Sequence, residues 1–298
     1  MADRSRREED SSPSPSPLAE NQGRLWTPWR MHYVAGGTRE DGCVFCNRFA
    51  EEDDVAGLIL HRGDRAFVIM NLFPYNTGHV MLVPNAHIAS PEIADVETLA
   101  ELSEVRAPIL RAARRALSPD GFNLGLNIGT VAGAGVADHL HEHIVPRWQG
   151  DTNFMPILAS TLVMPELLTV TYAKLRAEIE RELRGDNAAV SVVLSADGEK
   201  VLVDDEYQLP QVAGEDGEPL WRSVLRDTHA RGARDIELVG WGGETRAGGG
   251  PVVFLLRDTS SPELPGAIEQ PWIDVTALRR DADRKVVRAI MLRVSQAE

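Results

Sequence analysis

The sequence is poor in cysteine and in long apolar segments. Only two of its 298 residues are cysteines, Cys43 and Cys46, so no disulfide framework can hold the fold together. No apolar run approaches the length that spans a bilayer, and the first residues are polar, so we expect neither a membrane anchor nor a secretory signal. These absences predict a protein of the reducing cytoplasm.

Positive charge is also scarce. The formal net charge is −14, and lysine is rare although arginine is common. Broad binding to nucleic-acid backbones needs basic patches, so neither a nucleic-acid nor a membrane partner is expected. A small anionic ligand can still bind where single arginines and backbone amides converge. The length and the hydrophobic share of 43% suffice for two ordinary domains with their own cores.

The composition changes along the chain and divides it into three parts. Residues 1–22 are charged and then repeat Ser-Pro, which is typical of a disordered tail. Just beyond it, Trp26 and Trp29 indicate either an arm that packs on the body or on a partner subunit, or a local surface cluster. A helix predicted over residues 166–184 ends at Gly-Asp-Asn, which indicates a boundary. We therefore expect one domain over residues 23–187 and a smaller one over residues 188–298.

Three of the eight histidines stand at alternate positions of one stretch, which ends in β-branched residues and a proline. They are His139, His141 and His143. Successive side chains of a strand point to opposite faces, so these three imidazoles would share one face. Such a face can divide its work among a metal ligand, a nucleophile and a phosphate-contacting donor. The alternative is a histidine-rich surface strand or an accidental metal trap.

Cys43 and Cys46 form a Cys-x-x-Cys pair, which can be a redox dithiol or half of a tetrahedral zinc site. The redox interpretation requires a strand before the pair and a helix after it, whereas an acidic loop is expected to follow here. Zinc needs two further ligands, and histidines are the available type. The candidates are His87 and His139.

Short apolar runs between turn residues predict strands, and one long apolar periodicity predicts a helix. The expected strands cover residues 58–60, 66–70, 79–83 and 122–128, with a turn at 61–64 and the helix at 90–117. Beyond residue 187, strands are expected at 190–194, 201–204, 236–239 and 252–256, and helices at 220–230 and 282–294. The pattern predicts an α+β protein with a smaller α/β part at its C-terminal end.

Several residues near the predicted strand ends could contact a ligand. Asn71 either binds a ribose or a base or caps a turn, and His79 is expected to support its loop by a hydrogen bond. Glycines in the loop 129–135 allow backbone N–H groups to approach a phosphate, although hairpin turns use glycine as well.

The histidine stretch ends in Pro-Arg-Trp, follows the glycine-rich loop, and has Gly78-His79 and Pro84 upstream. In these features it resembles the histidine-triad (HIT) superfamily over residues 24–184. The Pro-Arg-Trp ending and the run 150–154 are similar to the bacterial diadenosine tetraphosphate phosphorylases of that superfamily. The resemblance implies a half-barrel of antiparallel strands with helices, usually paired into a homodimer. It also implies a structural zinc and no metal at the reaction centre.

The resemblance also implies a role for each matching position. His141 would be the nucleophile that attacks the α-phosphorus of a dinucleoside polyphosphate and carries the nucleotide covalently, and His143 would orient the phosphate. Asn71 matches a ribose contact and Asn127 an active-site asparagine. Zinc-bearing members have ligands at the positions of Cys43, Cys46, His87 and His139. Arg147 and the Trp148 beside it are further candidates for substrate binding.

Two positions depart from the family pattern. Gly135 stands where the dinucleoside hydrolases have a glutamine, and the room that it leaves favours inorganic phosphate over water as the acceptor. The expected reaction therefore yields ATP and ADP from diadenosine tetraphosphate; a dinucleoside polyphosphate or phosphoramidate hydrolase and a zinc-stabilised nucleotide-binding scaffold are the alternatives. Glu142 takes a position that is usually apolar, so we expect it to meet an arginine or solvent.

The C-terminal part loosely resembles a Nudix domain in its order of strands and helices. The glutamate-rich metal-binding helix of that family is missing, because the segment 225–232 ends in glycine without the paired glutamates. The resemblance implies a degenerate domain without catalysis, and an unrelated small α/β appendage is the alternative.

Overall fold

The computed structural model describes residues 41–151, 166–233, 235–242, 251–259 and 272–297. The predicted tail, Trp26, Trp29 and residues 152–154 lie outside the described residues. Arg39–Gln149 and Pro165–Glu298 cluster into one compact unit that contains two sheets. None of the helices described is long and apolar enough to cross a membrane.

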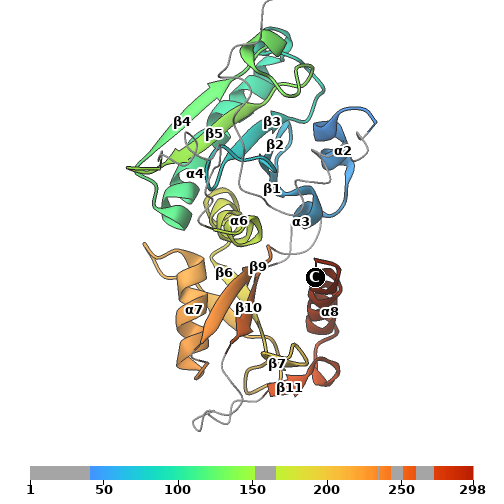
Figure 1. Ribbon diagram of the computed structural model, residues 1–298, viewed down its shortest axis with the longest axis vertical. Coiled ribbons are helices and arrows are strands. Elements are labelled where there is room, and N and C mark those ends of the chain that lie inside the picture. Colours follow the sequence, from blue (N-terminus) through green and yellow to red (C-terminus); the bar gives the residue numbers. More distant parts are fainter. Residues whose placement is uncertain (1–40, 152–165, 234, 243–250, 260–271, 298) are drawn as a thin grey trace, which may run out of the picture. The chain divides into compact units, whose positions relative to one another are not determined.

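The first sheet has five strands in the order β1-β2-β3-β5-β4, and every neighbouring pair is antiparallel (Figure 1). The strands are β1 Ile59–Arg62, β2 Ala66–Met70, β3 Val80–Pro84, β4 Gly121–Leu126 and β5 Glu142–Arg147. β1 and β4 are its edges, so the sheet is open within the described part of the chain. The expected α+β class with an antiparallel sheet is confirmed.

The two faces of this sheet pack on different partners. Helices α4 (Val96–Leu117) and α6 (Leu168–Arg184) share a core with one face, and α2 (Val44–Ala50) packs on the other. The register pairs Met81 with His143 and Leu82 with Glu142. Since cross-strand partners point to the same face, His143 lies on the α2 face and Glu142 on the α4 face.

Most predicted elements are found, with shifted ends. The helix expected from residue 90 begins only at Val96, because Asp95 accepts a hydrogen bond from Thr98 N–H at 2.6 Å and caps it; a 3-10 turn, Pro91–Ile93, precedes it. The strand expected to reach residue 128 ends at Leu126. The acidic loop expected at residues 51–54 is present at 51–53, but the helix α2 between Cys43 and this loop was not predicted.

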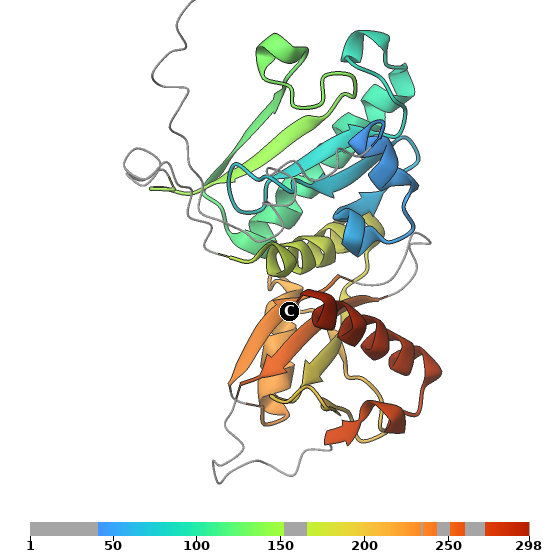
Figure 2. The same cartoon turned by 45° about the vertical axis from the view of Figure 1, so that its right-hand side comes forward.

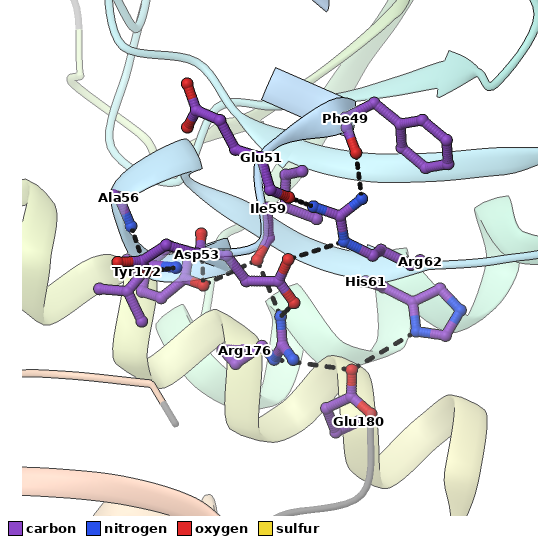
Figure 3. A network of polar contacts seen from close by, with 12 residues as sticks. Phe49, Glu51, Asp53, Ala56, Ile59, His61, Arg62, Tyr172, Arg176 and Glu180 are labelled. Atoms are coloured by element: carbon purple, nitrogen blue, oxygen red, sulfur yellow. Dashed lines mark hydrogen bonds and ion pairs between the residues drawn. The ribbon is translucent and has the colours of Figure 1, made fainter. Parts of the chain in front are cut away.

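The turn expected at residues 61–64 was wrong in its first half, because β1 continues through His61 and Arg62. Both side chains belong to a buried polar network with α3 (Asp54–Gly57) and α6, which Figure 3 shows from close by. Arg62 Nε donates to Asp54 at 2.7 Å, and Tyr172 Oη donates to the Ile59 carbonyl at 2.7 Å. The first bond joins α3 to the edge strand β1, and the second joins α6 to the same strand.

The second sheet has the order β11-β7-β6-β10-β9, with β8 also paired to β6. Its strands are β6 Ala188–Leu194, β7 Lys200–Leu202, β8 Gln211–Ala213, β9 Ile236–Gly240, β10 Val252–Asp258 and β11 Trp272–Asp274. Only β6 and β10 are parallel among the described pairs, as a connection through a helix allows. The expected smaller α/β part is thus present, and the short strands β8 and β11 were not predicted.

Helices cover both faces of the second sheet. Figure 2 shows α7 (Leu220–Ala230) and α8 (Asp281–Ala297) on opposite sides of it. Ala173 and Ala177 of α6 belong to the same apolar cluster as α7. Helix α6 therefore contributes to the cores of both sheets, since its Leu175 and Ile179 pack with the first.

Candidate active site and metal site

The alternating histidines gather at the start of β5, on the face of the sheet that α2 covers. The strand itself begins at Glu142, so His139 and His141 precede it. The ring centroids of His141 and His143 are 4.9 Å apart, and Phe45 of α2 contacts both His139 and His141. His139 and His141 are buried. The predicted common face is therefore present, although the strand is shorter than expected.

One group of four side chains could hold a metal ion. The ligand atoms of Cys43, Cys46, His87 and His139 all lie within 4.8 Å of one another. Cys43 Sγ lies 3.2 Å from His139 Nδ1, and Cys46 Sγ lies 3.4 Å from His87 Nδ1. Tetrahedral zinc with bonds of about 2.0–2.3 Å places neighbouring ligand atoms about 3.3–3.8 Å apart, so the spacing fits.

The surroundings of this group suit a metal as well. His139 Nε2 donates to the Pro84 carbonyl at 3.0 Å, which leaves the Nδ1 lone pair directed at the cysteines. Burial raises the pKa of the Cys46 thiol, with Cys43 as a further cause, so a cation is needed to favour the thiolates. A helix does follow Cys43, as the redox interpretation requires, but residues 41–42 before it form bends and not a strand.

His141 is prepared to act as a nucleophile. Its Nδ1–H donates to the His139 carbonyl at 2.8 Å, which fixes the tautomer with the lone pair on Nε2. Burial lowers the pKa of His141, so the imidazole is neutral at pH 7. No other hydrogen bond engages this ring within the described residues. Its Nε2 is therefore available to a ligand.

His143 and His79 form a pair whose protons can be assigned from their partners. Tyr75 N–H donates to His79 Nδ1 at 3.0 Å, so the proton of His79 is on Nε2. That Nε2 lies 3.0 Å from His143 Nδ1 and donates to it, which leaves His143 with its N–H at Nε2. Burial first, and the neighbouring histidines second, lower the pKa of His79 to about 3 and of His143 to about 4. His143 is thus a neutral donor.

The remaining candidates are Asn71, Asn127 and Gly135. Asn71 Oδ1 accepts a hydrogen bond from Phe73 N–H at 2.9 Å, so this side chain caps the turn, as one of its two expected roles required. Its Nδ2 also lies 3.3 Å from His79 Nδ1. Asn127 directly follows β4. Gly135 is exposed, and a Cβ built on it would meet nothing within 4 Å; room there for an acceptor stays a prediction.

Arg147 and Trp148 are not brought together with the histidines. Arg147 is four residues from His143 along β5, which corresponds to about 13 Å at about 3.3 Å per residue. Its guanidinium donates to Asn123 Oδ1 at 2.7 Å, and the Trp148 indole donates to the Ser118 carbonyl at 3.1 Å. Their contact with substrate stays a prediction.

Glu142 has the arginine partner that was expected. Arg106 of α4 donates to both carboxylate oxygens at 2.9 Å, from Nε and from Nη2. This bidentate pair lies on the face opposite the histidines, where Leu82 is its cross-strand neighbour. It therefore joins the histidine-bearing strand to α4 without entering the site.

Two aromatic residues of the site were not among the candidates predicted from the sequence. Phe45 lies inside the Cys-x-x-Cys pair and contacts two of the histidines. The ring centroid of Tyr75 lies 4.7 Å from that of His79 and 5.6 Å from that of His143. The Pro-Tyr-Asn-Thr-Gly loop directly before His79 was the signal that could have identified Tyr75.

The chain is similar in sequence to proteins of one family. The HIT domain model matches residues 54–150. The AP-4-A phosphorylase of Mycobacterium tuberculosis is 39% identical over 167 residues, which are 53% of this chain and 85% of that protein. An uncharacterized HIT-like protein of Saccharolobus solfataricus is 34% identical over 38% of this chain and 79% of its own.

Among solved structures, a Zn-bound histidine triad family protein from Mycobacterium smegmatis is 29% identical, with 47% of this chain and 94% of that one covered and a TM-score of 0.38. The likeness of the C-terminal part to Nudix domains stays a prediction. The alternating histidines, the family model and the relative matched over most of its length agree, and the chain belongs to the HIT family.

Proposed function

We propose that this protein is a nucleotidyltransferase that cleaves diadenosine tetraphosphate with inorganic phosphate to give ATP and ADP. The observation that carries the proposal is the state of His141, which is buried, neutral and held in one tautomer with Nε2 available. A binding scaffold does not need such a nucleophile. The similarity to a protein named AP-4-A phosphorylase supports the choice of substrate.

The first half of the reaction transfers a nucleotide to the enzyme. His141 Nε2 attacks the α-phosphorus, the bond from that phosphorus to its bridging oxygen breaks, and ATP leaves as the anion. An AMP group is then bonded to His141. Negative charge on the phosphoryl oxygens is met by the His143 N–H and by backbone amides of the loop 129–137, a compensation that positioned donors provide.

The second half regenerates the histidine. An oxygen of inorganic phosphate attacks the α-phosphorus, the phosphorus–nitrogen bond breaks, and ADP leaves. The open space at Gly135 supports phosphate as the acceptor, because no side chain occupies the position from which a glutamine would place water. Asn127, directly after β4, and Asn71 are the proposed contacts to the phosphoryl group and the ribose, and Arg147 and Trp148 are proposed to bind more distant parts of the substrate.

Zinc is the proposed occupant of the site formed by Cys43, Cys46, His87 and His139. It would stabilise the fold by joining the start of α2 to the segment before β5. Its link to the reaction centre is indirect, because the His139 carbonyl orients the His141 ring.

A homodimer is proposed from the edge strand β4. Leu124, Leu126 and Ile128 at this edge are exposed by 41–45% of their surface. An apolar edge strand is a template for pairing with a second chain, so a covered edge is more stable than a free one.

The test is an analysis of products from diadenosine tetraphosphate with and without phosphate. We expect repeated turnover to ATP and ADP only when phosphate is present, at most one equivalent of ATP per site without it, and no turnover by the His141→Ala variant with its folding intact. A substrate labelled in both adenosines should leave a labelled nucleotide on wild-type enzyme when phosphate is withheld. Release of AMP without phosphate would instead establish a hydrolase.

A further inference from the structure

Tyr75 is an exposed aromatic ring at the edge of the site, and no step of the proposed reaction uses it. Its side chain is 52% exposed, yet its ring centroid lies only 4.7 Å from that of His79 and 5.6 Å from that of His143. Its hydroxyl has no hydrogen-bond partner within the described residues. One face of this ring is thus presented beside the histidine that donates to phosphate.

The loop that carries Tyr75 is held in place at several points. The Tyr75 N–H donates to His79 Nδ1 at 3.0 Å, Asn76 Nδ2 donates to the Pro146 carbonyl at 3.1 Å, and His79 N–H donates to the Asn76 carbonyl at 3.2 Å. Gly78 closes the loop at a φ of +73°, which only glycine adopts readily. The ring is therefore preorganised, and a planar ligand can stack on it without a large entropic cost.

A series of ring contacts connects His141 to Tyr75 through His143. Phe45 contacts His141, His141 contacts His143, and His143 contacts Tyr75, with centroid distances of 5.0, 4.9 and 5.6 Å. Attacking and leaving atoms are roughly in line in phosphoryl transfer, so the leaving polyphosphate extends away from His141. A polyphosphate that extends past His143 would reach Tyr75, which contacts that histidine.

We infer that Tyr75 is the stacking platform for the nucleobase of the leaving nucleotide, and that it selects substrates with a second base at the far end of the polyphosphate. The inference rests on the proposed function for the direction of the reaction. Base stacking on aromatic side chains tolerates any base, so the subsite would distinguish dinucleotides from mononucleotides and not adenine from guanine. Tyr75 acts here as a specificity-determining residue.

The experiment compares two substrates in one set of variants. Diadenosine tetraphosphate carries the second base, and adenosine 5′-tetraphosphate carries the same phosphate chain without it. The measured quantity is the ratio of kcat/KM for the first substrate to that for the second. We expect Tyr75→Ala and Tyr75→Leu to lower this ratio about tenfold, the loss of one base–aromatic stack, and Tyr75→Phe to preserve it. Tyr207→Ala removes another exposed tyrosine, 42% exposed in the C-terminal part, and should preserve the ratio.

The opposite results are equally specific. If Tyr75→Leu keeps the ratio, or if Tyr75→Ala lowers both substrates equally and shifts their pH profiles, the ring only shields the His79–His143 pair and the inference is wrong. Calorimetric binding of both nucleotides to His141→Ala, with and without Tyr75→Ala, gives the same comparison without turnover. Failure of phosphorolysis would therefore refute the proposed reaction separately. If the ratio of the two nucleotides' affinities is the same with and without Tyr75→Ala, the subsite alone is refuted.

Discussion

Removing Arg106 should destabilise the protein through the carboxylate that it leaves behind. The Arg106–Glu142 pair is bidentate, and the side chains are 36% and 12% exposed, so Glu142 is the more buried partner. The hydrogen bond to Glu142 is also the main cause that raises the pKa of Arg106. Replacing Arg106 by Met keeps most of the stem and removes the charge, which isolates the cost of an unpaired carboxylate.

The expected loss of unfolding free energy in Arg106→Met lies between two limits. Breaking a fully buried pair costs about 3–5 kcal/mol, and an exposed pair contributes about 0.2–1 kcal/mol. With one partner nearly buried and the other about a third exposed, we expect Arg106→Met to lower the free energy of unfolding by about 2 kcal/mol. The double variant Arg106→Met/Glu142→Leu should recover to within about 1 kcal/mol of wild type, because a leucine there has apolar cross-strand neighbours, Leu82 and Leu126.

The assay is urea-induced unfolding of the wild type, both single variants and the double variant. Arg65→Met is the matched control, since its ion pair with Asp95 is 3.1 Å long but has both side chains about half exposed, and we expect no measurable change. If the double variant loses as much as the two single variants together, the pair is not a replaceable ion pair and the reasoning is refuted. A loss in Arg106→Met no larger than in the control would show that solvent screens the pair.

Three further predictions follow from the site. The Cys43→Ala variant should lose the bound zinc, as measured by elemental analysis, and have a lower melting temperature. It should keep residual turnover, whereas His141→Ala should have none. Equal partial losses of activity in both variants would refute this division of roles. A glutamine side chain at position 135 has open space, so the Gly135→Gln variant should also release AMP without phosphate. Unchanged products would show that Gly135 does not determine whether phosphate or water is the acceptor. The pKa of His79 is lowered to about 3 and that of His143 to about 4, so their contribution to stability is present above about pH 6.5 and is lost as the pH falls toward these values. The melting temperature should therefore fall between pH 6.5 and 4, less steeply in His143→Gln, and parallel curves would contradict this cause.

The sequence was most informative where one local pattern determines the structure. The alternation of His139, His141 and His143 predicted a common face, and it survives although the strand starts at Glu142. The four metal-ligand candidates also came from residue type and position, and their ligand atoms lie within 4.8 Å of one another. The arginine partner of Glu142 was expected from the cost of burying an unpaired carboxylate.

Tertiary contacts decided what the sequence could not. Helices α2 and α3 are too short for periodicity to predict them; α2 is stabilised by burial of Phe45, and α3 by the capping side chain of Asp53. β1 extends beyond the expected turn because His61 and Arg62 pair with Val68 and Phe67 of β2, and His61 also contacts Glu180, which is far away in the sequence. Tyr75 belongs to the site through two ring contacts that only the folded loop creates.

The shared helix α6 has a consequence for cooperativity. Its Leu175 and Ile179 pack with the first sheet, whereas its Ala173 and Ala177 pack with the second. Unfolding either sheet would expose an apolar stripe of the same helix, so neither can melt without weakening the other. We therefore expect thermal unfolding in a single transition despite the two sheets. A destabilising substitution in the C-terminal sheet should then also lower the temperature at which the histidine site unfolds, because α6 couples the two sheets.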